Sequence, residues 1–162
     1  MLTISNNPAA INFVVLQLNW LVKEIKKHLA SGKVFNCGQQ AGWHLILQFQ
    51  QSITAKQRAG IVDEAALLVD WDNQLRVLNL TELDKIIALK IICQSFMFLA
   101  QHLNVEYKNK KISRAEKSGW CFIKKIQRLN QKVLVEAKIH QKFGNKNKKN
   151  NGQFVSTPGL FM

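Results

Sequence analysis

Apolar residues recur every three to four positions along most of this chain, which is the spacing that puts side chains on one face of an α-helix. Only two prolines occur, Pro8 and Pro158, and the 149 residues between them contain none. Proline breaks helix interiors, and all-β chains need turn residues about every ten positions. The pattern therefore predicts an all-α protein, folded as an irregular bundle of about five helices.

Local signals near the start of the chain predict the first two helices. Asn7 is a favoured cap residue and Pro8 a favoured first helical residue, so a helix should begin at Pro8 and run to about Ala30. Gly32 follows as a helix stop. A second helix is expected from about Gln39 to Ile53. The apolar face of the first helix consists of Ile11, Val14, Val15, Leu18, Leu21, Val22, Ile25 and Leu29.

Two segments, Thr54–Gln57 and Ser113–Glu116, have the capping-box pattern. In this pattern the cap hydroxyl and the side chain three residues later each satisfy a backbone N–H at the start of a helix. The first segment predicts a third helix that begins there and runs to about Trp71, with Asp63 and Glu64 on its exposed side. Its inward residues are expected to be Val62, Ala65, Ala66 and Val69.

The last two helices are predicted by Thr81, followed by acidic residues, and by the second capping box. The fourth helix should end near Asn104, and the fifth near Phe143 after a length on the order of 45 Å. Residues 1–143 then form a helical domain, and residues 144–162 form a flexible basic tail that ends in a short apolar motif. The apolar stripes of the two helices are Ile86, Leu89, Cys93, Phe96, Ala100 and Leu103, and Phe122, Ile126, Leu129, Val133 and Ala137.

The composition is typical of a folded protein, since hydrophobic residues make up 47% of the 162 positions. The N-terminus lacks the pattern of a secretory signal. The longest apolar stretches, 11–22 and 86–100, are interrupted by polar residues, so no membrane span is expected. Cys37, Cys93 and Cys121 include no Cys-x-x-Cys pair and lie among apolar residues, which predicts reduced structural thiols and a cytoplasmic location.

The net charge of +13 is unevenly distributed. Residues 1–53 carry four basic and one acidic side chain, residues 54–105 carry five and six, and residues 106–162 carry fourteen and three. On the fifth helix, basic residues recur at four-residue spacing from position 124 to position 132, where like charges repel by roughly 0.3 kcal/mol per pair. A long row of one sign favours a phosphate backbone as its partner over a merely solvated face.

Nineteen of the 23 basic residues are lysine, which is a point charge, whereas bidentate readout of guanine favours arginine. We therefore expect contact with the backbone of RNA or DNA and little sequence specificity. Tyr107 is expected to be an exposed ring that stacks on an unpaired base, whereas Trp120 and Phe122 are expected in the core. The predicted nucleic-acid-binding residues are Lys108, Lys110, Lys111, Arg114, Lys117, Lys124, Lys125, Arg128, Lys132, Lys138 and Lys142.

Catalytic and metal-binding patterns are weak in this sequence. The four histidines are scattered, and no pair has the spacing of metal ligands. Six acidic residues in the middle of the chain could hold the metals of a nuclease, but their positions in a first helical turn and on exposed helix sides argue against it. No phosphate loop, dinucleotide fingerprint or nucleophile–base signature stands out. We therefore expect no catalytic residue, no metal and no cofactor.

These observations predict a non-catalytic nucleic-acid-binding protein, an accessory subunit of a larger nucleoprotein complex. It is similar in size, charge and helicity, though in no motif, to the small helical subunits of multi-subunit CRISPR effectors. One alternative is a helical scaffold or adaptor that binds an acidic partner protein. Another is a peripheral membrane protein, which is disfavoured because the apolar stripe of the fifth helix is needed for the core. The tail residues Phe154, Val155, Leu160 and Phe161 are expected either to fold back on the body or to dock on a partner.

Overall fold

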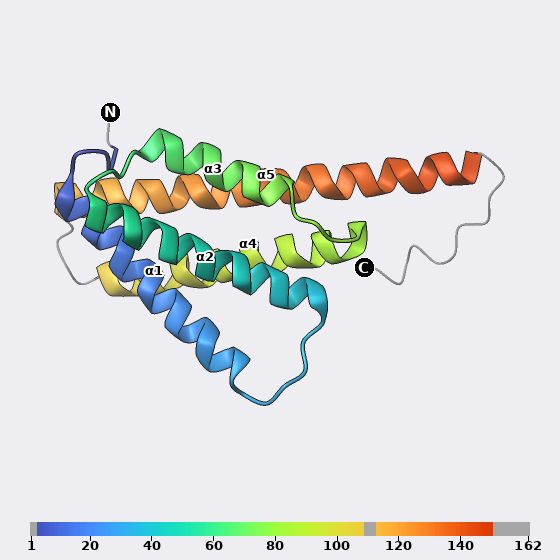
Figure 1. Cartoon of the computed structure of the whole chain (residues 1–162), viewed down its shortest axis with the longest axis horizontal. Helices are drawn as coiled ribbons and strands as arrows, with labels where there is room; N and C mark the ends of the chain where they lie inside the picture. The colour runs from blue at the N-terminus through green and yellow to red at the C-terminus, as the bar shows by residue number, and fades with distance from the viewer. Residues whose placement is uncertain (1–2, 109–112, 151–162) are drawn as a thin grey trace.

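The structure, a computed structural model, describes residues 3–108 and 113–150, without the side chains of residue 115 and residues 144–150. The described residues form five α-helices and no strand, which confirms the predicted all-α class (Figure 1). α5 is 37 residues long, so its backbone extends beyond the predicted end at Phe143. The helices are α1 (Pro8–Leu29), α2 (Cys37–Ala59), α3 (Glu64–Arg76), α4 (Glu82–Tyr107) and α5 (Arg114–Asn150).

The starts of α1 and α4 agree with the sequence prediction. The Asn7 side chain accepts a hydrogen bond from the backbone N–H of Ala10 at 3.2 Å, directly before the proline that opens α1. The Thr81 hydroxyl accepts one from the N–H of Asp84 at 3.1 Å. Both caps satisfy backbone groups that have no partner within the helix, which is why these residue types fix the helix starts.

The break between α2 and α3 does not lie at Thr54, where the capping-box pattern predicted it. Thr54 lies inside α2, and its hydroxyl donates to the backbone carbonyl of Gln50 at 2.8 Å. α2 ends instead at Gly60, whose φ of 69° lies in the left-handed region that glycine favours. Asp63 then caps α3 by accepting from the N–H of Ala66. The prediction of a helix start at Thr54 was therefore wrong.

Because α3 starts later than predicted, its inward face also differs from the prediction. Val62 is buried as expected, but Ala65, Ala66 and Val69 are exposed. The residues that α3 does bury are Glu64, Leu67, Trp71 and Leu75. The expectation that the carboxylate of Glu64 faces solvent was wrong, since only 5% of the residue is exposed.

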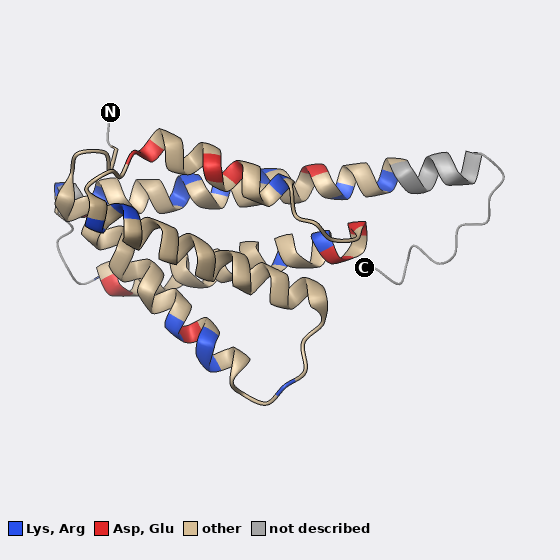
Figure 2. Ribbon diagram, in the orientation of Figure 1, with Lys and Arg blue, Asp and Glu red and all other residues tan. Residues whose placement is uncertain are grey.

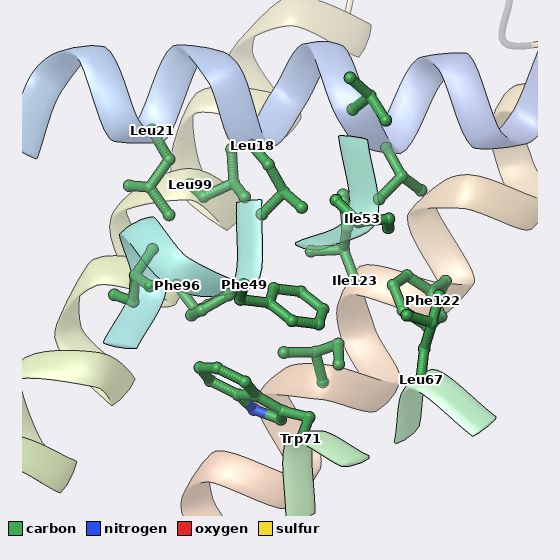
Figure 3. Packing of buried hydrophobic residues seen from close by; sticks show 14 of the residues in the cluster. Leu18, Leu21, Phe49, Ile53, Leu67, Trp71, Phe96, Leu99, Phe122 and Ile123 are labelled. Atoms are coloured by element: carbon green, nitrogen blue, oxygen red, sulfur yellow. The ribbon is translucent and has the colours of Figure 1, made fainter. Parts of the chain in front are cut away.

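The core lies where all five helices meet, around the rings of Phe49 and Trp71 (Figure 3). The centroids of these two rings are 4.7 Å apart, and Phe96 of α4 lies 6.2 Å from Trp71. The buried indole Nε1 of Trp71 donates to Oδ1 of Asn130 on α5 at 2.7 Å. Asn130 is itself fully buried, so the indole N–H of Trp71 has its hydrogen-bond partner inside the core.

α2 and α4 approach each other closely through Gly38 and Gly42, which lie one helical turn apart on α2. A Cβ atom added at Gly42 would lie 2.7 Å from the backbone carbonyl oxygen of Ala88, and one at Gly38 would lie 2.7 Å from that of Asp84. Any larger side chain would therefore force the helices apart. These two glycines set the separation of the pair of helices that carries much of the core.

α4 is long and apolar enough to cross a membrane by length and composition alone, with 26 residues and a mean hydropathy of 1.6 in its most apolar stretch. A buried core helix has the same length and composition, and 44% of this stretch is buried inside the structure. The helix therefore gives only weak support for a membrane span. The expectation that the chain has no membrane span stays a prediction.

α3 runs parallel to α5 with a nearly constant offset along the chain. Glu64 contacts Lys125, Trp71 contacts Asn130, and Arg76 contacts Glu136, with sequence separations of 61, 59 and 60 residues. α4 connects them by running in the opposite direction, as Figure 1 shows. The highly charged α5 thus lies beside α3, with acidic residues on α3 next to basic residues on α5 (Figure 2).

Candidate nucleic-acid interface

α5 carries a row of exposed basic side chains on the side opposite its core residues. Phe122, Ile126 and Val133 point into the bundle and are buried. Residues seven and four positions apart share a side of a helix, so the cations that follow this spacing lie together on the solvent side. From Lys117 to Lys142 the row extends on the order of 37 Å. We define the basic face as Lys117, Lys124, Arg128, Lys132, Lys138 and Lys142, all exposed.

None of the six residues of the basic face forms an ion pair with an acidic side chain of the described residues. The basic residue of the neighbouring α3 is matched instead: Arg76 pairs with both Asp72 and Glu136. The guanidinium of Arg76 is held mainly by its hydrogen bond to Glu136 and also by Asp72, and these raise its pKa. The uncompensated positive charge of this region is therefore concentrated on the solvent side of α5.

Lys125 was predicted as a nucleic-acid-binding residue, but the structure places it in an internal ion pair. Its Nζ lies 2.7 Å from Oε2 of Glu64, whose side chain is only 7% exposed. Its charge already has a partner, and its position lies to one side of the basic face. We therefore do not include Lys125 in the interface.

Tyr107 was predicted to be an exposed ring for base stacking, and the expected exposure was wrong. The ring is half-buried, stacks on Trp120 with centroids 5.3 Å apart, and lies 5.7 Å from the ring of Phe13. Its hydroxyl donates to Oε2 of Glu116 at 3.1 Å. Burial, and then the hydrogen bond to Glu116, raise the pKa of the Tyr107 phenol. Tyr107 joins α1, α4 and α5 instead of presenting a stacking surface.

Glu116 was also expected to complete a capping box with Ser113, and its Oε2 is the acceptor for Tyr107. The Ser113 hydroxyl accepts from the N–H of Glu116 at 3.1 Å, so half of the predicted box is present. Trp120, half-buried beneath Tyr107, has Lys124 Nζ 4.9 Å from its ring centroid. This cation–π contact positions one lysine of the basic face. Phe122 is fully buried, as predicted.

A groove of about 450 Å³ lies between α3 and α5, next to the basic face. Its apolar lining consists of the half-buried Leu68 and Leu129 and the exposed Val69. Arg128 and Lys132 of the basic face line the α5 side, and the ion-paired Asp72 and Arg76 line the α3 side. We call this the α3–α5 groove. Sequence reasoning missed it because α3 was assigned the wrong inward face.

The outer part of α5 carries a second feature that the sequence prediction did not identify. Val135, Ile139 and Phe143 are 54%, 48% and 59% exposed, and their four-residue spacing places them together on the solvent side. We call them the apolar strip. They interleave with Lys138 and Lys142. The part of the basic face from Lys117 to Lys132, which we call its inner part, therefore exposes cations, whereas the part with Lys138 and Lys142 exposes cations and apolar side chains.

The other predicted site residues lie apart from this arrangement. Lys108 and Arg114 are exposed at the end of α4 and the start of α5. Lys110 and Lys111 lie outside the described residues, as do the four apolar tail residues Phe154, Val155, Leu160 and Phe161.

Residues 3–108 and 113–150 contain no group of three or more histidine, cysteine, aspartate or glutamate side chains that could hold a metal ion. Several of the acids are engaged elsewhere: Asp63 caps α3 and Asp72 binds Arg76. Of the cysteines expected to be structural thiols, Cys93 is buried, Cys121 is half-buried and Cys37 is exposed. Burial raises the pKa of the Cys93 thiol to about 11.

Comparison of the chain with models of protein families gives no match, and neither do searches of curated proteins and of solved structures.

Proposed function

We propose that this protein is a non-catalytic nucleic-acid-binding protein that contacts the phosphate backbone through the basic face of α5. The observation that carries the proposal is the row of six exposed cations without an acidic partner among the described residues. Each phosphate that such a row neutralises releases condensed counterions, and this supplies affinity without sequence readout. The row contains five lysines and one arginine, which favours backbone contact over recognition of base edges.

We further propose that the protein works in the cytoplasm as an accessory subunit of a larger nucleoprotein assembly. The long basic helix of an irregular bundle would lie along the nucleic acid, while other surfaces contact neighbouring subunits. The apolar strip supports such a contact, because exposed apolar residues grouped on one helix side mark protein interaction sites. The same strip also favours the second candidate function, a scaffold or adaptor whose α5 binds an acidic amphipathic partner.

A charge-reversal experiment tests nucleic-acid binding. The variant Lys124→Glu/Arg128→Glu/Lys132→Glu changes the inner part of the basic face, whose side chains are exposed. The matched control Lys23→Glu/Lys26→Glu/Lys27→Glu makes the same change in net charge on exposed residues of α1. The end of α1 that carries them points away from α5 (Figure 1). Fluorescence anisotropy with labelled RNA and DNA measures affinity between about 50 and about 200 mM salt.

We expect the wild-type protein and the α1 control to bind with steep salt dependence. The α5 variant should lose affinity by more than about tenfold, and its slope of log affinity against log salt should fall by about 3. Equal binding by both variants, or a flat salt response of the wild type, would contradict phosphate contact through α5. Failure of every nucleic acid to bind, with tight binding of an acidic amphipathic peptide, would favour the scaffold instead.

A further inference from the structure

We propose that the α3–α5 groove receives an unpaired base, so that the ligand is single-stranded nucleic acid with its phosphates on the α5 side. This inference rests on the proposed function and names the class of nucleic acid that it uses. The groove is continuous with the basic face, because Arg128 and Lys132 belong to both. Its volume of about 450 Å³ lies within the range of ligand-binding pockets, about 300–1,000 Å³.

The two sides of the groove differ in net charge. On the α3 side the charge of Arg76 is matched by Asp72 and Glu136, and at one end Lys125 is matched by Glu64. On the α5 side neither Arg128 nor Lys132 forms an ion pair with a described residue. A nucleotide has the same asymmetry, with a neutral base on one side and an anionic phosphate on the other.

The apolar side chains that line the groove give the base a surface on which to lie. Leu68 and Leu129 are half-buried and Val69 is exposed, so all three offer apolar atoms toward the groove. Apolar side chains hold extruded bases in many nucleic-acid-binding pockets. At the α3 rim, the paired Asp72 and Arg76 present hydrogen-bond acceptors and donors at fixed positions, since Arg76 Nε lies 3.1 Å from both Asp72 oxygens. The hydrocarbon chain of an aliphatic anion could not form hydrogen bonds with this polar rim.

A duplex does not fit the groove in the same way. Its bases are stacked and paired inside the double helix, and extruding one costs a few kcal/mol. A single strand presents its bases without that cost, and each base that stacks on a protein surface adds affinity. The basic face alone would bind both forms through phosphate, whereas a base in the groove favours the single strand.

Binding of the full chain to three labelled oligonucleotides distinguishes these possibilities. The probes are a single strand, a single strand with abasic sites and a duplex, with equal length and charge per strand. Val69→Gln replaces an exposed apolar side chain of the groove with a longer polar one, without a change in charge and without adding an aromatic stacking surface. Val34→Gln is the matched control, because Val34 is 97% exposed in the connection between α1 and α2. Circular dichroism verifies that both variants are folded.

We expect the intact single strand to bind about tenfold more tightly than the abasic strand and the duplex. Val69→Gln should lower its affinity toward that of the abasic strand and leave the salt slope unchanged, while Val34→Gln should bind like the wild type. Equal, salt-dependent binding of all three probes would overturn the inference and leave the proposed function standing. Base preference that persists undiminished in Val69→Gln would also overturn it. Binding of none of the probes would overturn the proposed function itself.

Discussion

The buried carboxylate of Glu64 pairs with Lys125 on α5 and also binds the N-terminal segment, so it joins three segments of the chain. Its Oε2 accepts from Lys125 Nζ on α5 at 2.7 Å, and its Oε1 accepts from the backbone N–H of Ile4 at 3.1 Å. A buried carboxylate is stable only when its oxygens are paired, so this contact fixes the start of α3 against α5 and the N-terminal segment. It thereby sets one end of the α3–α5 groove.

Removal of the ammonium group of Lys125 should destabilise the protein. Lys125→Met keeps most of the aliphatic stem but leaves the Glu64 carboxylate buried without its cation. Because Lys125 is 31% exposed, we expect a loss of about 2 kcal/mol, less than for a fully buried pair. Urea denaturation measures the free energy of unfolding. The exposed exchange Lys132→Met on the same helix should change it by less than about 0.5 kcal/mol, and equal effects of the two would refute the role of the pair.

The hydrogen bond between Trp71 and Asn130 should be important for stability as well. Asn130→Ala leaves the buried indole N–H without an acceptor and opens a small cavity, with an expected loss of about 3 kcal/mol. Gln131→Ala changes the next residue, which is exposed, and should have little effect. Thermal unfolding followed by tryptophan fluorescence compares the two variants. A melting temperature for Asn130→Ala equal to that of the control would show that the bond contributes little.

Gly42 should not tolerate even one added methyl group. Alanine favours helices by about 1 kcal/mol over glycine, so an exposed helix position would gain from the exchange. At Gly42 the new Cβ meets the backbone of α4, and overpacking should cost about 2 kcal/mol net. Gln48→Ala, at an exposed site of the same helix, provides the control in chemical denaturation. A Gly42→Ala protein as stable as the wild type would mean that α2 and α4 are not held at this separation.

Tyr107 should titrate abnormally, and it is the only tyrosine of the chain. Burial and the hydrogen bond to Glu116 raise its pKa, so the folded state favours the neutral phenol. The stabilisation is present below the pKa of an unfolded tyrosine, about 10, and is lost as pH rises above it. At about pH 11, phenolate absorbance should stay low in the folded protein and increase when denaturant is added.

Glu116→Gln supplies the variant for this titration. It removes the charge that opposes phenolate formation, so the midpoint should shift toward about 10. Glu24→Gln, on α1, should leave the midpoint where it is. A folded protein that ionises at the ordinary pH of tyrosine would contradict the buried position of the ring.

Local signals in the sequence predicted those parts of the fold that local interactions determine. The caps Asn7 and Thr81 and the long apolar stripes were sufficient to predict α1 and α4. The pattern at Thr54 was misleading because a threonine inside a helix can bond to the carbonyl four residues earlier. The combination of Gly60 and Asp63 was visible in the sequence and marks the true break. Asn36 and Gln39 form a reciprocal capping box at the start of α2 that the same rule would have identified.

The candidate site was predictable only as far as helix periodicity determines it. The spacing of Lys124, Arg128 and Lys132 placed them correctly on one exposed side of α5. The state of Lys125 depends on Glu64, 61 residues earlier, and the burial of Tyr107 depends on Phe13 and Trp120. No local pattern encodes such contacts between distant segments, and the α3–α5 groove arises from the same tertiary packing.

The constant offset of about 60 residues between α3 and α5 has a consequence for the order in which the chain assembles during translation. Ribosomes synthesise α1 to α4 first, and the glycine-mediated contact between α2 and α4 requires nothing that comes later. Until the last helix emerges, the indole of Trp71 has no acceptor in Asn130 and the Glu64 carboxylate has no ammonium partner. Completion of the hydrophobic interior is therefore delayed until the segment that bears the positive charge has been made.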